Sequence, residues 1–170
     1  MERISIFIDG SNLYHGMKSL FGRTDLDFAR LVDWLVQGRT LVRTYYYNAT
    51  VSATHDPQRA SNQQRFFASL ARIPYFTVRL GRLEPRGSSF VEKGVDIAIA
   101  VDMLSMAYIN AYDTAILVSS DGDFAKAICA VCDLGKHVEA ACFRKAYHVK
   151  AAADKVTELN ENSLAPLWLK

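Results

Sequence analysis

The sequence predicts an α/β fold in which helices cover both faces of a mostly parallel sheet. Short apolar runs alternate with helical stretches, and the runs at 4–8 and 115–119 are almost continuously apolar, as buried parallel strands are. No repeat, low-complexity segment or linker divides the 170 residues. We therefore expect one domain over residues 1–170, with a core at about 4–143 and a C-terminal helix and tail at 144–170.

Periodicity and turn chemistry predict the elements in order. Apolar or alternating runs predict strands at 4–8, 41–50, 76–83, 115–119 and 138–143. Helical spacing with capping residues predicts helices at about 13–20 and 28–37, from Pro57 onward, and at 96–109, 124–134 and 146–154. The tail at 156–170 is expected to hold a small strand and a final turn.

Three of these segments carry a more detailed expectation. The run 76–83 alternates apolar and polar residues, so it is expected to be a half-exposed edge strand. The segment 85–94 is expected to be a loop. The helix at 96–109 is apolar nearly all round and is therefore expected to be well buried.

Composition indicates a soluble globular protein. Half of the residues are hydrophobic, 22% are charged, and the formal net charge is +2. Three cysteines do not make a disulfide framework, so a cytoplasmic location is expected. The N-terminus is too briefly apolar for a signal peptide, and no run is long enough to cross a membrane.

Four aspartates are expected to meet at one edge of the sheet. Asp9 and Asp121 end strands, whereas Asp96 and Asp123 begin helices. Parallel strands end at the same edge at which crossover helices begin, and that edge is the usual ligand crevice of such sheets. If the first and fourth strands are adjacent, Asp9 and Asp121 lie on chains roughly 5 Å apart.

Such a group of acids favours a bound divalent cation. Carboxylates that close cannot all stay ionised in apolar surroundings without a counter-charge. Hard oxygen ligands with few histidines indicate Mg²⁺ or Mn²⁺ as the metal. An acidic pocket on an otherwise basic surface suits a phosphodiester substrate, which a metal ion polarises for attack by water.

Structural roles for the same acids are the alternative. Asp9 and Asp123 could each cap the helix that follows, and Asp123 is expected to do so in any case. Capping does not explain Asp121, which precedes Gly122. Asp102 lies six residues after Asp96, about 9 Å along the helix axis, so a supporting role behind the metal ligands is as well founded as a direct one.

Three linked motifs resemble the signature blocks of NYN domains. They are Phe7-Ile-Asp9-Gly-Ser-Asn12, Lys93-Gly-Val-Asp96 with Asp102, and Ser119-Ser-Asp121-Gly-Asp123-Phe124. The chain is most similar to the LabA-like bacterial group of these PIN-like nucleases. The resemblance implies a three-layer PIN-like (Rossmannoid) fold with strand order 3-2-1-4-5 and Mg²⁺-dependent cleavage of RNA. Where the family most often has Ser-Gly-Asp, this chain has Ser119-Ser120-Asp121.

The resemblance also implies roles for individual residues. Asp9, Asp96, Asp121 and Asp123 match the acidic metal site, and Asn12 matches the polar residue that accompanies the first aspartate. Lys93, Arg86 and Ser120 are expected to contact the substrate. Together these residues predict an Mg²⁺- or Mn²⁺-dependent endoribonuclease that acts on RNA, with DNA as a minor substrate. The alternative is a catalytically weak or inactive module that binds RNA or a protein.

Two further patterns allow more than one interpretation. Cys129, Cys132, His137 and Cys142 have the spacing of a zinc knuckle, but helical periodicity up to Leu134 and the apolar strand after it favour buried structural cysteines. In the tail, the apolar side chains of Leu164, Leu167, Trp168 and Leu169 could cover the core or a second subunit of a homodimer, and the sequence does not decide between these arrangements.

Overall fold

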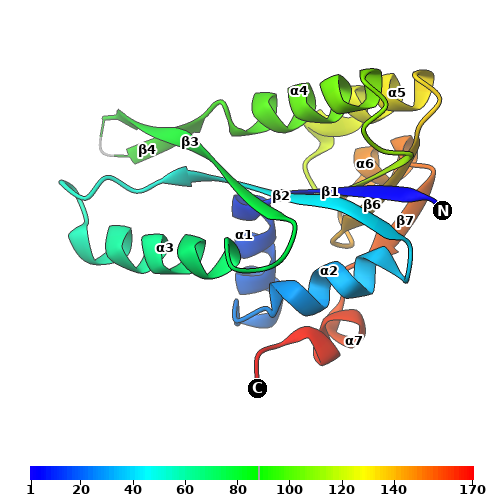
Figure 1. Cartoon of the computed structure of the whole chain (residues 1–170). Coiled ribbons are helices and arrows are strands. Elements are labelled where there is room, and N and C mark those ends of the chain that lie inside the picture. Colours follow the sequence, from blue (N-terminus) through cyan, green and yellow to red (C-terminus); the bar gives the residue numbers. More distant parts are fainter. Residues whose placement is uncertain (88) are drawn as a thin grey trace.

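The structure is a computed structural model that describes residues 1–87 and 89–170. One sheet with the order β4-β3-β2-β1-β5-β6-β7 forms its centre (Figure 1). The strands are β1 Arg3–Asp9, β2 Thr40–Thr50, β3 Phe76–Arg86, β4 Ser89–Lys93, β5 Thr114–Val118, β6 His137–Cys142 and β7 Lys155–Glu158. Neighbouring strands are parallel except β3 and β4. The predicted order 3-2-1-4-5 is confirmed, with β7 added beyond its last strand.

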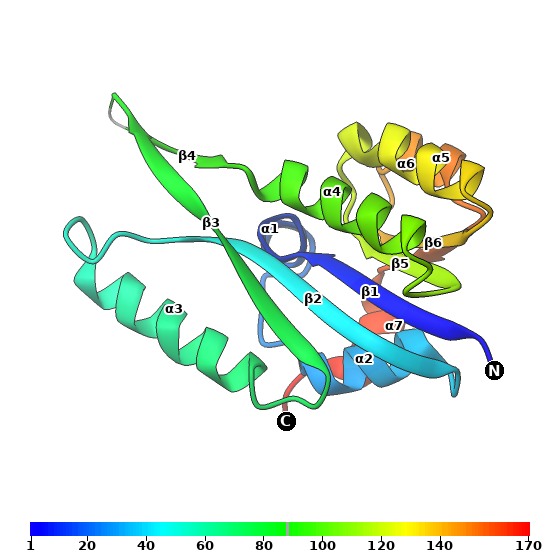
Figure 2. The ribbon, with the colours of Figure 1, turned by 45° about the horizontal axis from the view of Figure 1, so that its top comes forward.

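Helices cover the two faces of the sheet and form a three-layer domain (Figures 1 and 2). One layer contains α1 Gly10–Phe21, α2 Phe28–Val36, α3 Pro57–Leu70 and α7 Glu161–Leu164. The opposite layer contains α4 Val95–Tyr108, α5 Ala125–Asp133 and α6 Tyr147–Ala152. Two single turns of 3₁₀ helix, η1 Gly122–Phe124 and η2 Ala165–Leu167, complete the elements.

The sheet separates two apolar cores because side chains alternate along each strand. Ile4, Ile6 and Ile8 of β1 face the layer of α1 and α2, whereas Phe7 faces α4 and α5. β1 is almost fully buried, as its continuous apolar run predicts. Asp9 follows Phe7 in this alternation, so it belongs to the face that α4 and α5 cover.

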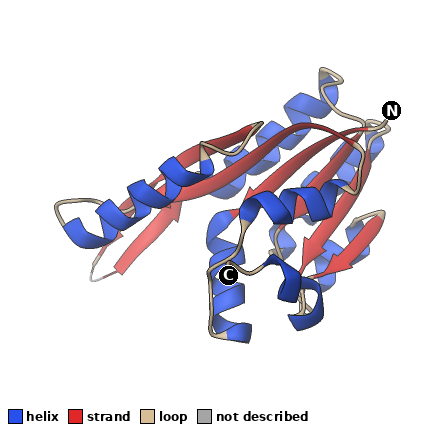
Figure 3. Ribbon diagram, turned by 60° about the horizontal axis from the view of Figure 1, so that its bottom comes forward, coloured by secondary structure: helices blue, strands red, loops and turns tan. Residues whose placement is uncertain are grey.

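The C-terminal tail covers the core of its own chain, where the sequence left two arrangements open. Leu164 and Leu167 are buried in the layer of α1 and α2. The Asp27 amide donates to the Leu167 carbonyl over 2.8 Å, and the Leu169 amide donates to the Asp25 carbonyl over 2.9 Å. The chain end therefore lies against the segment that leads into α2 (Figure 3).

Three sequence expectations about the elements are wrong. Residues 85–94 are not a loop, since β3 continues to Arg86 and returns as β4; Ser88 lies outside the described residues. β4 therefore occupies the sheet edge that the sequence assigned to β3. The helix α4 is only half buried: Ile97, Val101 and Tyr108 are exposed, because an apolar pattern all round a helix does not reveal how much of it a neighbour covers.

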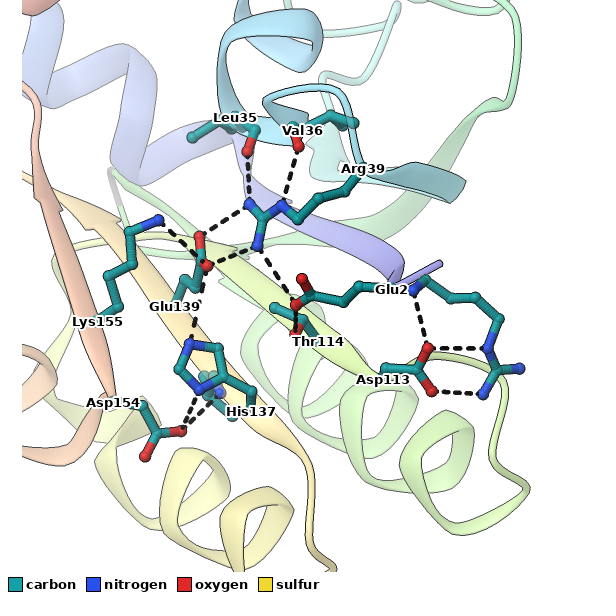
Figure 4. A network of polar contacts seen from close by, with 12 residues as sticks. Glu2, Leu35, Val36, Arg39, Asp113, Thr114, His137, Glu139, Asp154 and Lys155 are labelled. Carbon is teal, nitrogen blue, oxygen red and sulfur yellow. Dashed lines mark hydrogen bonds and ion pairs between the residues drawn. The ribbon is translucent and has the colours of Figure 1, made fainter.

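A polar network ties the strand beginnings together at the edge opposite Asp9 (Figure 4). The Arg39 guanidinium donates to the buried Glu139 carboxylate over 2.7 Å, and Lys155 reaches the same carboxylate at 3.3 Å. Arg3 pairs with Asp113 over 2.7 Å, and this contact lowers the pKa of Asp113 to about 2. No helix among the described residues has the length and apolar character that crossing a membrane requires.

Candidate metal and nucleic-acid site

Asp9 lies at the carboxyl end of the central strand and is almost fully buried. Its Oδ1 accepts a hydrogen bond from the backbone amide of Asn12 over 3.1 Å, so Asp9 caps α1 as the sequence suggested. Its Oδ2 accepts a hydrogen bond from the Ser119 hydroxyl over 3.1 Å. Because β1 and β5 are adjacent and pair as far as Ile8 and Val118, Asp9 and Ser119 leave the sheet side by side. The predicted adjacency of the two strand ends is confirmed.

The turn after β5 is held by the residues around Asp9. The Ser119 hydroxyl accepts the Asp121 amide over 3.2 Å while it donates to Asp9. The Asn12 side-chain oxygen accepts the Ser120 amide over 2.8 Å. The signature residues of the two strand ends therefore form one hydrogen-bonded unit, and Asn12 acts within it as a brace between the turns.

Ser120 takes a role that the sequence did not indicate. Its hydroxyl accepts the Phe143 amide over 2.8 Å and so fixes the end of β6 to this turn. The side chain is half-buried. A hydroxyl used in this way supports the turn, so the structure offers no geometric support for the predicted contact of Ser120 with substrate.

Asp121 and Asp123 lie on the short η1 turn that leads into α5. The Asp121 carboxylate accepts the Asp123 amide over 2.9 Å and caps this turn, whereas the Asp123 side chain makes no capping bond to α5. The prediction that Asp123 caps its own helix is therefore wrong. The 3₁₀ turn moves the start of α5 to Ala125 and leaves the Asp123 carboxylate exposed.

Asp96 lies in the first turn of α4 and interacts electrostatically with Asp121 and Asp123. Although the residue as a whole is exposed, loss of hydration around its carboxylate raises its pKa, and the negative charges of Asp121 and Asp123 raise the pKa further. The carboxylates of α4 and of the η1 turn therefore act on one another across the sheet edge. Asp9 is tied to the same turn through Ser119. The structure brings the four predicted acids to one edge, as the topology requires.

The acids gather loosely. Within the described part of the chain, no three His, Cys, Asp or Glu side chains lie close enough together to enclose a metal ion. Mg²⁺ nevertheless keeps several of its waters and needs only one or two carboxylates as direct ligands. A buried aspartate with two nearby exposed acids fits that mode of binding. Asp9, Asp96, Asp121 and Asp123 would hold the ion, partly through water.

The basic side chains form a separate group near the start of α4. A small cavity of about 150 Å³ there is lined by Arg79, Arg82 and Lys93, together with the Tyr47 ring. Arg79 pairs with Asp102, and the Tyr47 hydroxyl donates to the same carboxylate over 2.7 Å. Asp102 therefore faces the basic group and not the acids. Lys93 pairs with Glu84 over 2.8 Å.

One predicted residue, Arg86, remains to be placed, and the fold adds one residue that the sequence missed, His148. Arg86 lies exposed at the end of β3, beside the turn of the β3–β4 hairpin. His148 of α6 was given no role from the sequence, yet its ring packs over Gly122, where an added Cβ would lie 3.1 Å from Cδ2. Only the fold shows this contact, because α6 follows the turn by 25 residues and no motif links them.

The cysteine–histidine spacing is not a zinc knuckle. Cys129 and Cys132 lie on α5, whereas His137 and Cys142 lie on β6. Cys142 is buried, and all three thiols are free. The helix and the strand that a knuckle would abolish are both present. The expectation that all three cysteines are buried holds only for Cys142, because Cys129 is exposed and Cys132 is half-buried.

This fold, with paired acidic turns at the carboxyl edge, defines the class of protein. The chain belongs to the NYN domain family, whose model matches residues 3–160. It is similar to the low amplitude and bright protein LabA of Synechococcus elongatus, with 30% identity over 135 residues. The match covers 75% of this chain but only 66% of LabA, so this chain spans just under two thirds of that relative. The predicted LabA-like resemblance is confirmed.

A solved structure supports the fold independently. A protein of unknown function from Vibrio parahaemolyticus superimposes with a TM-score of 0.77. The superposition covers 99% of this chain and 96% of the Vibrio chain at 23% sequence identity. The likeness extends over nearly the whole chain and concerns the fold alone.

Proposed function

We propose that this chain is a Mg²⁺- or Mn²⁺-dependent ribonuclease that hydrolyses phosphodiester bonds of RNA. The observation that carries the proposal is the gathering of acids at the carboxyl edge of the sheet, where the Ser119 hydroxyl bonds both to the buried Asp9 carboxylate and to the Asp121 amide. The charges of Asp121 and Asp123, which raise the pKa of Asp96, agree with this arrangement. Negative charge gathered at the ligand crevice of a parallel sheet needs a cation to be stable. Membership of the NYN family supports the same class of activity.

Each residue would have a definite task. When bound, the ion would supply a Lewis acid that polarises the phosphate and lowers the pKa of water. Asp9, held by Ser119 and by the Asn12 amide, would keep a fixed carboxylate oxygen toward the ion. The exposed Asp96 and Asp123 would hold the water shell. In-line attack by water would leave a 5′-phosphate and a 3′-hydroxyl end.

The basic group would position the RNA backbone. Lys93 and Arg82 line the cavity next to the start of α4, and Asp96 lies in the first turn of that helix. Phosphates bound there would therefore lie beside the acidic edge. RNA is the expected substrate and DNA a minor one.

The loose grouping of acids favours one second candidate. Because no described set of three metal-binding side chains is closely packed, the domain could bind RNA or a protein without turnover. The two functions differ in one property. A nuclease requires its acids for cleavage, whereas a binding module loses repulsion and binds RNA more tightly when an acid is neutralised.

The deciding experiment compares wild type with Asp121→Asn on single-stranded and structured RNA. We expect cleavage that needs Mg²⁺ or Mn²⁺, stops with chelator and is abolished in the variant. Asp133→Asn is the matched control, because Asp133 is exposed at the far end of α5. If wild type and Asp121→Asn are equally inert while both bind RNA, the domain is a binding module.

A further inference from the structure

A second and much larger cavity opens on the other face of the sheet. It is a groove of about 850 Å³ between α1 and α3, with the end of β2 as its floor. This volume lies in the upper part of the range for ligand sites. Gly10 and Ser11 line one end of the groove, and they directly follow Asp9. The start of α1 therefore lies between the groove and the candidate metal site.

Aromatic rings line the groove. Tyr46 and Phe66 pack edge to face at 5.8 Å between ring centroids, with Phe28 beside both. Phe66 is half-buried, and Tyr14 on the α1 side is 40% exposed. Among the Phe and Tyr rings that line the groove, the two that keep accessible surface thus come from opposite walls, Phe66 from α3 and Tyr14 from α1. Such surfaces suit the flat faces of nucleobases, which stack on aromatic rings whatever their sequence.

The polar side chains along the α3 wall are partly fixed and partly free. Gln63 is fixed, because its side chain accepts the Val51 amide over 2.8 Å and donates to the Ala49 carbonyl over 2.9 Å. The preceding residue, Asn62, accepts a hydrogen bond from the Gln58 side chain over 3.2 Å, and its own amide nitrogen has no partner among the described residues. That nitrogen is a donor that the edge of a base could use.

The charge of the groove also favours a nucleic acid. Asp56 is the one acidic side chain among the described lining residues, and it is engaged in capping α3 by accepting the Arg59 amide over 2.9 Å. Arg59 lines the groove, and its side chain makes no ion pair within the described part of the chain. On α1, Lys18 lies over the Tyr14 ring, 5.8 Å from its centroid, although Lys18 is not itself one of the lining residues. Arg59 in the groove and Lys18 beside it are complementary to a phosphodiester backbone.

We propose that this groove binds unpaired nucleotides of the RNA next to the scissile phosphate. The bases would lie against Tyr14 and Phe66, and Arg59 would hold a backbone phosphate. The proposal rests on the ribonuclease function and narrows its substrate to RNA with a single-stranded segment. Paired bases are excluded because their faces are already stacked within the duplex.

The test measures binding with catalysis switched off. Fluorescence anisotropy in EDTA would compare a labelled single-stranded oligoribonucleotide with the same strand in a blunt duplex. We expect the single strand to bind wild type at least tenfold more tightly than the duplex. Tyr14→Ala and Arg59→Ala should each weaken single-strand binding about tenfold. Tyr108→Ala and Arg72→Ala are the controls, since both side chains are exposed away from the groove.

Photocrosslinking then locates the bases. An oligoribonucleotide that carries 4-thiouridine should crosslink to Tyr14 or Phe66, as mass spectrometry of the digested protein would show. Crosslinks confined to the basic group around Lys93, or equal affinity of wild type, Tyr14→Ala and Arg59→Ala, would overturn the groove proposal. Failure of the wild type to bind either the single strand or the duplex would also overturn the proposal.

The outcome is separable from that of the proposed activity. If the wild type cleaves RNA with metal and the groove variants bind the single strand as tightly as the wild type, the ribonuclease proposal stands and the groove proposal fails. If the groove variants bind more weakly but the wild type is as inert as Asp121→Asn, the groove proposal stands and the ribonuclease proposal fails. In every variant, circular dichroism and thermal melting would confirm the fold, and Tyr14→Phe should retain the stacking and the affinity.

Discussion

The Ser119 hydroxyl donates to the buried Asp9 carboxylate over 3.1 Å and at the same time accepts the Asp121 amide over 3.2 Å. One side chain thereby fixes the first acid of the site and the turn that carries the next. A shift of the Asp9 carboxylate would therefore disturb the backbone of the turn that carries Asp121. This relationship explains why the site can be sensitive to a residue that is not itself an acid.

Ser119→Ala should therefore reduce both stability and activity. The variant removes a partner of a buried carboxylate, which costs about 1–3 kcal/mol of unfolding free energy. Loss of a group that orients a metal ligand should lower metal-dependent cleavage about 10- to 100-fold. Urea denaturation and cleavage of a defined RNA measure the two effects. Unchanged cleavage in a folded Ser119→Ala protein would remove Asp9 from the proposed metal site.

Ser5→Ala is the natural comparison, and its expected effect has the opposite sign. Ser5 is fully buried on β1, and its hydroxyl has no hydrogen-bond partner within the described part of the chain. Removing an unsatisfied hydroxyl should leave the unfolding free energy unchanged or raise it by about 1 kcal/mol. Cleavage should stay at the wild-type rate. A clear loss of stability would show that the hydroxyl has a bonded partner, such as an internal water.

The sequence correctly predicted the features that follow from a recognised motif, from the topology of parallel sheets or from local helix capping. The order of the parallel strands was implied by the resemblance to NYN domains, whereas the shared edge of Asp9 and Asp121 follows from the rule that parallel strands end at one edge of a sheet. Asp9 as a helix cap follows from local chemistry alone.

The failures concern contacts between elements. The pattern of α4 shows apolar residues on every side, but coverage of Ile97 and Val101 depends on how far α5 extends beside it. The 3₁₀ turn forms where the sequence placed an Asp123 cap, and it depends on the Asp121 carboxylate accepting a hydrogen bond from the Asp123 backbone amide. Asp102 faces Arg79 because β3 passes that side of the helix, which no spacing within α4 reveals.

The convergence of the acids can be tested without metal or substrate. Burial, Asp121 and Asp123 together raise the pKa of Asp96 above its ordinary value of 3.8. Asp121→Asn or Asp123→Asn removes one of the charges, so the pKa of Asp96 should fall toward that value. Carbon-detected NMR titration of the carboxyl groups in EDTA measures it, with Asp133→Asn as control. An unchanged Asp96 pKa in both site variants would mean that the carboxylates do not share one edge.

The network at the opposite edge should control stability in acid (Figure 4). Burial raises the pKa of Glu139, but the hydrogen bonds and charge of Arg39, with Lys155, lower it by more, so it lies below its ordinary value of 4.5. A folded-state pKa below the unfolded one adds stability above about pH 4.5, and this stability is lost as the pH falls through the folded value. The wild type should therefore weaken in that range.

Arg39→Met tests this network directly. It leaves the Glu139 carboxylate buried with Lys155 as its remaining close cation, and loss of one partner of a buried pair costs about 3–5 kcal/mol. We expect the lower end of that range at pH 7 because Lys155 remains.

The pKa of Glu139 should rise in the variant, and its protonation then relieves the buried charge. The difference in unfolding free energy between wild type and Arg39→Met should therefore shrink between pH 7 and pH 4, as urea denaturation at both values would measure. Arg30→Met, which breaks an exposed pair with Asp27 at 3.3 Å, should cost less than about 1 kcal/mol at either pH. An equal loss at pH 7 and pH 4 in Arg39→Met would assign the effect of Arg39 to its hydrogen bonds with the Leu35 and Val36 carbonyls at the end of α2.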